Sequence, residues 1–155
     1  TKPQIKSLVK EIATDCSMPY VIERWLGGTF TNWPIILKRI EYFKELERKK
    51  AEGELEKYTK KERLQIDKEL KTLGKKFQGL RNLSRLPDAI FISDLKKDEG
   101  ALKEAKLKNI PIIAICDTNV DPTLVDFPIP GNDDAIISIR YILEKIKEVL
   151  LKNKP

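Results

Sequence analysis

Residues 34–85 have the spacing of two charged amphipathic helices, and this pattern constrains the fold more than any other. Pro34 suits the first turn of a helix, where its missing N–H is no loss, and a run of helix formers follows it as far as Gly53. Thr59, with Glu62 three residues later, is a capping-box pattern that predicts a second helix. The heptad stripe of that helix consists of Ile66, Leu70, Leu73, Phe77 and Leu80. Two such helices joined by a short link are predicted to pair antiparallel, as a coiled-coil hairpin.

The end of this region carries charge of one sign. No acidic residue lies between Glu69 and Asp88, whereas five basic residues do: Lys71, Lys75, Lys76, Arg81 and Arg85. A charge run on a helix is most often a solvated face. Here the run lies at the base of a projecting hairpin and has polar residues interleaved, which favours contact with a phosphate backbone.

Residues 1–33 and 86–155 are predicted to form an α/β domain around the hairpin. The segments 89–93 (AIFIS) and 112–116 (IIAIC) are apolar throughout, and 127–129 is a third, shorter strand. Strands that are apolar on both faces and alternate with helices imply a parallel sheet covered on both sides. The helices are predicted at 3–13, at 98–109 and after Gly131-Asn132, the last with a buried stripe that includes Val149.

The predicted sheet has few strands. Three strands are predicted, or four with a short apolar strand at 19–22, whereas doubly wound sheets usually have about five or more. The helix at 3–13 also lacks a strand before it. We therefore expect an incomplete α/β sheet, cut on its N-terminal side, with the hairpin inserted.

The composition favours an anionic partner over catalysis. The formal net charge is +6 and the pI is about 9.2. The absence of histidine removes histidine-activated nucleophiles, histidine acid–base chemistry and histidine metal ligands. Cys16 and Cys116 form no CxxC motif and are expected to be small buried hydrophobes in a reducing compartment. No apolar run reaches the ~18 residues of a membrane span, so no membrane partner is expected.

An acidic turn follows the second apolar strand. Residues 109–139 contain no Lys or Arg, and Asp117 and Asp134 are expected at the carboxyl edge of the sheet, where α/β proteins bind ligands. These two carboxylates are candidates to share a divalent cation, because hard cations take oxygen ligands. The alternative, which we favour, is local: Asp133 and Asp134 complement the dipole of the last helix, Asn132 caps that helix, and Asp121-Pro122 makes a turn. No other cofactor is expected.

Four motifs are specific enough to indicate a family. They are RWLGGTFTNW at residues 24–33, LPDAIFISD at 86–94, IPIIAICDTNVDP at 110–122 and PIPGNDDA at 128–135. Together they resemble the bacterial-type ribosomal protein S2 family. The resemblance implies a flavodoxin-like (Rossmann-like) α/β domain with a protruding coiled coil, placed between the head and body of the small ribosomal subunit. It also implies contacts with small-subunit ribosomal RNA and with neighbouring ribosomal proteins, in many bacteria including S1, and no catalytic activity. About the first eighty residues of the family, with two strands, have no counterpart here.

The resemblance adds motif residues to the candidate RNA-binding set. These are Arg24, Trp25, Thr31 and Asn32, which join the five basic residues of the hairpin base. A tryptophan of a small domain more often packs in the core, so Trp25 has that alternative role. The expected location is a ribosome, in the cytoplasm or in an organelle. Two other functions stay open, a coiled-coil protein adaptor and a Rossmann-like nucleotide-binding module, although the GxGxxG and GxxxxGK[ST] motifs are absent.

Overall fold

Three short parallel strands lie at the centre of the α/β part of the molecule. The computed structural model describes residues 1–153, and within them the strands are β1 (Ile90–Ile92), β2 (Ile112–Cys116) and β3 (Phe127–Pro130), in the order β1-β2-β3. Both pairs are parallel, with Ile90 opposite Ile112 and Ile115 opposite Ile129. The predicted fold class is confirmed: this is an α/β chain with a small parallel sheet, consistent with a partial flavodoxin-like fold.

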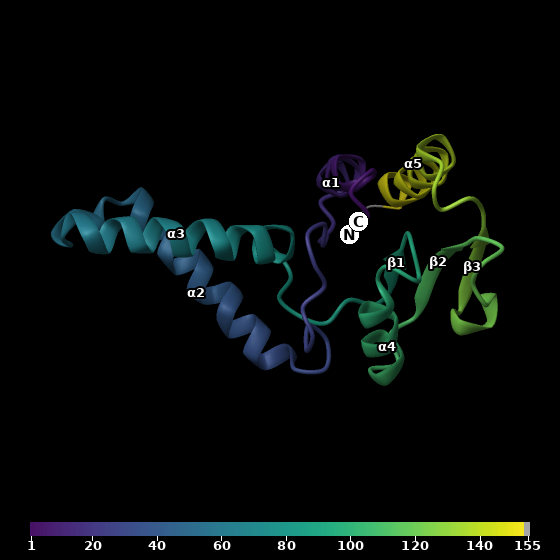
Figure 1. The fold of residues 1–155 in the computed structure, drawn as a ribbon, viewed down its shortest axis with the longest axis horizontal. Helices are drawn as coiled ribbons and strands as arrows, with labels where there is room; N and C mark the ends of the chain where they lie inside the picture. The colour runs from purple at the N-terminus through teal and green to yellow at the C-terminus, as the bar shows by residue number, and fades with distance from the viewer. Residues whose placement is uncertain (154–155) are drawn as a thin grey trace.

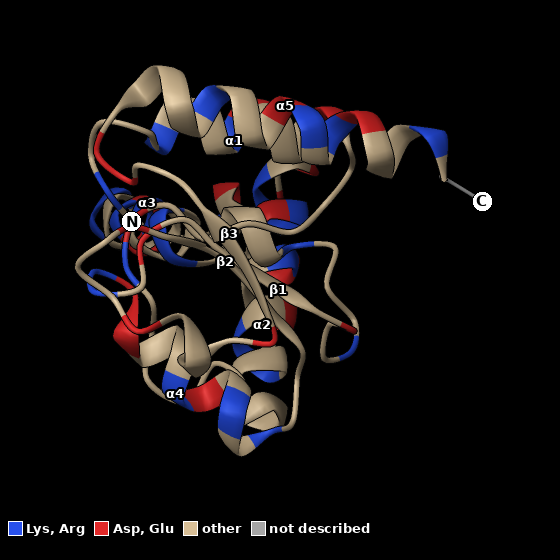
Figure 2. Ribbon diagram, turned by 90° about the vertical axis from the view of Figure 1, so that its right-hand side faces the viewer, with Lys and Arg blue, Asp and Glu red and all other residues tan. Residues whose placement is uncertain are grey.

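Helices cover both faces of this sheet (Figures 1 and 2). α1 (Lys6–Asp15) and α5 (Ile136–Lys152) lie on one side, and α4 (Glu99–Leu107) lies on the other. Successive side chains of a strand point to opposite faces, so Ile115 packs with α1 and α5 while Ala114 packs on the α4 side. This two-sided burial is the reason that the strands are apolar throughout.

The buried stripe of α5 is shorter than predicted. Ile139 and Leu143 are buried in one cluster with apolar residues of α1, but Val149 is 59% exposed. Figure 2 shows the last turns of α5 extending past the sheet. The amphipathic spacing continues there, yet no segment within residues 1–153 buries Val149, so that part of the prediction is wrong.

A helical hairpin projects away from the sheet (Figure 1). It consists of α2 (Trp33–Ala51), the short 3-10 helix η1 (Glu54–Lys57) at the tip and α3 (Lys60–Phe77). The predicted capping box of Thr59 and Glu62 is present. The stripe buried between the helices contains Ile36, Ile40, Phe43, Leu46, Leu70, Leu73, Phe77 and Leu80, with Ile66 partly buried. The heptad spacing therefore identified the buried face of α3.

Residues 19–22 do not form the predicted strand. Their backbone runs along the base of the hairpin instead, where the Tyr20 N–H donates to the Gly79 carbonyl oxygen (2.9 Å) in the 3-10 helix η2 (Gln78–Leu80). A Cβ on Gly79 would lie 2.1 Å from the Tyr20 oxygen, so this approach requires glycine. An apolar run becomes a strand only where its backbone can pair with the edge of a sheet. The backbone of this segment hydrogen-bonds to the base of the hairpin instead.

Two expectations from composition concern membrane spans and cysteines. Within the described part of the chain, no helix is long and apolar enough to cross a membrane. Cys16 and Cys116 are both free and buried, as the sequence predicted.

Candidate nucleic-acid interface

The loop at residues 24–33 is held by a single buried carboxylate. Glu104 of α4 accepts hydrogen bonds at Oε1 from Trp25 Nε1 (3.1 Å) and from the Gly28 N–H (2.8 Å). Its Oε2 accepts from the Phe30 N–H (2.8 Å), the Thr31 N–H (3.0 Å) and the Thr31 hydroxyl (3.1 Å). Gly28 has a φ of 89°, a left-handed conformation in a turn from which three backbone N–H groups converge on the carboxylate. The motif thus forms an anion site that the chain fills with its own glutamate.

Glu104 stays ionised at neutral pH in spite of its burial. Burial raises the pKa of its carboxyl, but the hydrogen bonds from Thr31, Phe30, Trp25 and Gly28 outweigh this effect, so the pKa lies below its ordinary value. An ionised carboxylate carries no proton, so both of its oxygens are free to accept these hydrogen bonds.

The arrangement settles where the predicted loop residues lie. Trp25 packs edge-on against Phe30 with ring centroids 4.8 Å apart, and its indole N–H is occupied by Glu104. Thr31 uses its amide and its hydroxyl on the same carboxylate. Arg24 and Asn32 are exposed, and neither side chain forms a hydrogen bond or ion pair with another residue of 1–153. Arg24 and Asn32 therefore remain accessible to a partner, whereas Trp25 has the packing role that was its alternative.

Four lysines line a groove at the base of the hairpin. The groove has a volume of about 300 Å³ and lies between α3, the segment 20–23 and α1. Glu23 also lines it, but this carboxylate pairs with Lys6 (2.9 Å). None of the four lysines forms a salt bridge with a carboxylate in the part of the chain that the structure describes. We call this the basic groove, and its lysines are Lys10 of α1 and Lys71, Lys75 and Lys76 of α3.

The two arginines of the basic stretch are paired with carboxylates. Arg81 Nη2 lies 3.3 Å from Glu47 Oε2 of α2. Arg85 forms two hydrogen bonds of 2.8 Å with Asp88, and these contacts lower the pKa of Asp88. The prediction that both guanidiniums bind phosphate therefore requires an exchange of partners. Exposed pairs contribute little to stability, so the exchange is feasible, but the lysines of the basic groove need none.

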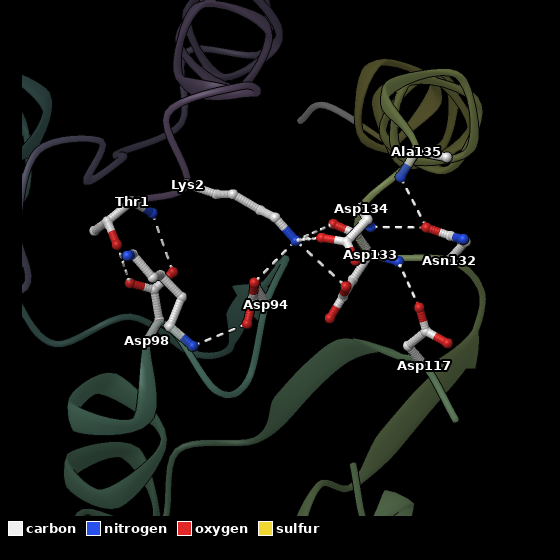
Figure 3. Close-up of polar contacts among 10 residues, drawn as sticks. Thr1, Lys2, Asp94, Asp98, Asp117, Asn132, Asp133, Asp134 and Ala135 are labelled. Atoms are coloured by element: carbon white, nitrogen blue, oxygen red, sulfur yellow. Dashed lines mark hydrogen bonds and ion pairs between the residues drawn. The ribbon is translucent and has the colours of Figure 1, made fainter. Parts of the chain in front are cut away.

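At the carboxyl edge of the sheet, Lys2 lies between three aspartates (Figure 3). Its ammonium contacts Asp134 Oδ1 (2.6 Å), Asp94 Oδ2 (3.0 Å) and Asp133 Oδ1 (3.3 Å). It also donates to the Asp133 carbonyl oxygen (2.6 Å), and the Lys2 side chain is 10% exposed. Burial lowers the pKa of Lys2, but the contacts with the carboxylates raise it above its ordinary value. Lys2 therefore supplies a permanent positive charge to this edge.

Asp117 and Asp134 are not brought together around one ion. Asp134 pairs with Lys2, whereas Asp117 accepts from the N–H groups of Thr118 (2.6 Å) and Asp133 (3.3 Å). Among residues 1–153, no group of three or more His, Cys, Asp or Glu is placed to hold a metal ion. A shared divalent cation stays a prediction without support from this geometry.

Local hydrogen bonds account for the other polar residues of the acidic turn. Asn132 Oδ1 accepts from the N–H groups of Asp134 (2.8 Å) and Ala135 (2.7 Å), which closes the turn before α5. The Asp121 carboxylate accepts from the Thr123 N–H (2.9 Å) at the 3-10 helix η3 (Pro122–Leu124). The predicted turn at Asp121 is confirmed. Asn132 is not the N-cap of α5, because the helix begins at Ile136 with Ala135 at the N-cap and with no acidic residue in its first turn, so the capping part of the local interpretation is wrong.

Sequence comparison identifies the family. The chain matches the family model for ribosomal protein S2 over residues 1–153. It belongs to the ribosomal protein S2 family. The small ribosomal subunit protein uS2 of Dictyoglomus thermophilum is 48% identical over 99% of this chain and 63% of its own length. The uS2c protein of Cyanophora paradoxa is 45% identical over 98% of this chain and 65% of its own length. The chain thus spans slightly less than two thirds of the length of these relatives.

Three polar residues of this S2-family chain were not found by sequence reasoning. Glu104 had a detectable signal, because it follows Ala101 by three positions and so shares the buried face of α4. Lys2 and Lys10 had none, since their roles depend on which distant segments fold beside them.

Proposed function

We propose that this chain is part of a structural component of the small ribosomal subunit and that it binds small-subunit ribosomal RNA. The observation that carries this proposal is the 48% identity, across 99% of the chain, to a protein named as a small ribosomal subunit protein. The role is binding rather than catalysis. Its partners are small-subunit RNA and neighbouring ribosomal proteins, with S1 as a candidate, and its location is a ribosome of the cytoplasm or of an organelle.

The basic groove is the surface that fits RNA best. Four lysines and one glutamate line it, and that glutamate is already paired with Lys6. Lysines bind phosphate oxygens as point charges and release counterions from the RNA when they do so. Arg24 and Asn32 are the accessible residues of the loop and are proposed as additional contacts.

The carboxyl edge of the sheet favours this function over a nucleotide-binding module. In α/β proteins that bind nucleotides, this edge receives the phosphates. Here Asp94, Asp133 and Asp134 surround the place and the Lys2 ammonium lies among them. Carboxylates at that position repel a phosphate, and the Lys2 ammonium already pairs with all three of them.

Co-sedimentation tests the proposed function. The purified chain is mixed with small ribosomal subunits from which the resident S2-family protein has been removed, and the mixture is separated on a sucrose gradient. We expect the chain to migrate with the subunits and to be released by high salt. A chain that stays at the top of the gradient at low salt, while a full-length relative binds, would contradict the proposal.

A further inference from the structure

The basic groove is assembled across the junction between the hairpin and the α/β part. Lys71, Lys75 and Lys76 belong to α3, whereas Lys10 belongs to α1. The spacing between these charges therefore depends on the direction in which the hairpin leaves the sheet. If the hairpin swings, Lys10 and the α3 lysines separate, and a continuous phosphate backbone no longer meets all of them.

The two parts of the molecule pack on themselves more than on each other. α2 and α3 bury their apolar stripe together, while α1, α4 and α5 pack around the sheet. The direction of the hairpin is consequently set by the chain segments that join it to the sheet. One of these segments is the loop at 24–33, which leads directly into α2 at Trp33.

Glu104 is the group that attaches this loop to the α/β part. Its carboxylate receives the three backbone N–H groups of Gly28, Phe30 and Thr31, so it restrains the main chain as well as side chains. Glu104 is only 8% exposed, so water competes little with its carboxylate for these donors. Trp25 reinforces the contact, because its ring lies against Phe30, which is buried with apolar side chains of α4.

We propose that Glu104 is a positioning residue that sets the direction of the helical hairpin and thereby the spacing of the basic groove. The consequence for RNA affinity rests on the proposed function, whereas the effect of Glu104 on the hairpin direction exists without RNA. Glutamine at position 104 would retain one acceptor oxygen, while its NH₂ group would face two N–H donors in either orientation of the amide. The loop would lose its fixed path, and the hairpin would sample several directions.

The test measures the hairpin direction in the free protein. Nitroxide labels are placed at Lys57→Cys on the tip and Glu144→Cys on α5, in a chain with Cys16→Ala and Cys116→Ala, and distances are measured by double electron–electron resonance. We expect one narrow distance distribution in the parent and a broad or shifted one in Glu104→Gln, with unchanged helical circular dichroism. Glu99→Gln, on the same helix but exposed and paired with Lys103, is the matched control and should leave the distribution narrow.

RNA binding by the same variants separates this inference from the proposed function. Glu104→Gln should weaken binding to small-subunit RNA by about tenfold or more, while the Lys residues and the circular dichroism stay unchanged. A broad distribution with unchanged RNA affinity would reject the groove as the RNA site but keep Glu104 as the positioning residue. A narrow, unshifted distribution in Glu104→Gln overturns the inference.

A second variant covers the case in which Glu104→Gln does not fold. Gly28→Ala leaves the carboxylate in place but strains the loop, because φ is 89° and the new Cβ would lie 3.2 Å from Asn32 Cβ. It should broaden the same distribution, and a narrow distribution in this folded variant counts against the inference.

Discussion

Glu104 links the loop at 24–33 to α4 through hydrogen bonds that require its ionised form. The pKa of this carboxyl lies below its ordinary value, so its stabilising contribution is complete above the unfolded-state pKa of about 4.3. That contribution is lost as the pH falls through the lower folded-state pKa. We therefore expect the difference in unfolding free energy between the parent and Glu104→Gln to shrink between pH 7 and pH 3. Denaturant unfolding at several pH values checks this, and a difference that is constant with pH would contradict it.

Lys2 is the one cation shared by three aspartates at the carboxyl edge of the sheet within residues 1–153. Its replacement in Lys2→Gln leaves Asp94, Asp133 and Asp134 without their shared cation. Asp94 and Asp133 are buried, and removal of one partner from a buried ion pair costs about 3 kcal/mol, whereas the exposed side chain of Asp134 adds little. Mg²⁺ should then stabilise the variant more than the parent, because the carboxylates repel one another.

Thermal melts with and without Mg²⁺ measure both effects. Lys108→Gln is the control, because Lys108 is exposed and forms no salt bridge among residues 1–153. Equal Mg²⁺ responses in parent and Lys2→Gln would mean that Lys2 does not take the place of a cation. A Mg²⁺ gain in the parent that Asp117→Asn abolishes would instead support the shared-cation prediction.

At the scale of elements, the hairpin depends on one apolar stripe. Leu73→Ala removes a side chain buried between α2 and α3 and should destabilise the hairpin by about 2–3 kcal/mol. Leu64→Ala is the matched control, because Leu64 lies on the same helix and is 57% exposed. Amide hydrogen exchange should speed up in α2 and α3 for Leu73→Ala while β2 keeps its protection. Equal exchange in both variants would contradict this view of the hairpin.

The contrast between α3 and residues 19–22 shows which features were predictable. The stripe from Leu70 to Phe77 is a property of local spacing, so the helix and its buried face follow from the sequence. The strand at 19–22 was wrong because strand formation depends on a pairing partner, and Gly79 at the hairpin base pairs with Tyr20 instead. The candidate site divides in the same way: the lysines of α3 were found from their charge run, but Lys10 joins them through tertiary packing alone.

At the scale of the whole molecule, the α/β part leaves apolar surface uncovered. Ile137 and Tyr141 of α5 are exposed, and Phe127 is exposed on the edge strand β3. Such surface and open strand edges favour association and reduce the net stability of a small core. We expect the chain alone to melt below about 60 °C or to aggregate on heating. A cooperative and reversible melt of the monomer above that temperature would contradict this expectation.

The salt dependence of RNA binding shows whether the basic groove contacts phosphates. The affinity for small-subunit RNA is measured against salt concentration for the parent and for the triple variant Lys71→Gln, Lys75→Gln and Lys76→Gln. The control carries the same change of charge on α3 at Lys60, Lys61 and Lys68, which do not line the groove. Arg81 is left unchanged, because it pairs with Glu47.

Each lost phosphate contact lowers the slope of log affinity against log salt by about 0.7–0.9. The groove variant should therefore bind more weakly and show a slope smaller by about 2, while the control stays close to the parent. Equal slopes and affinities for the groove variant and the parent would show that these lysines are a solvated helix face, and the RNA contact would have to lie elsewhere.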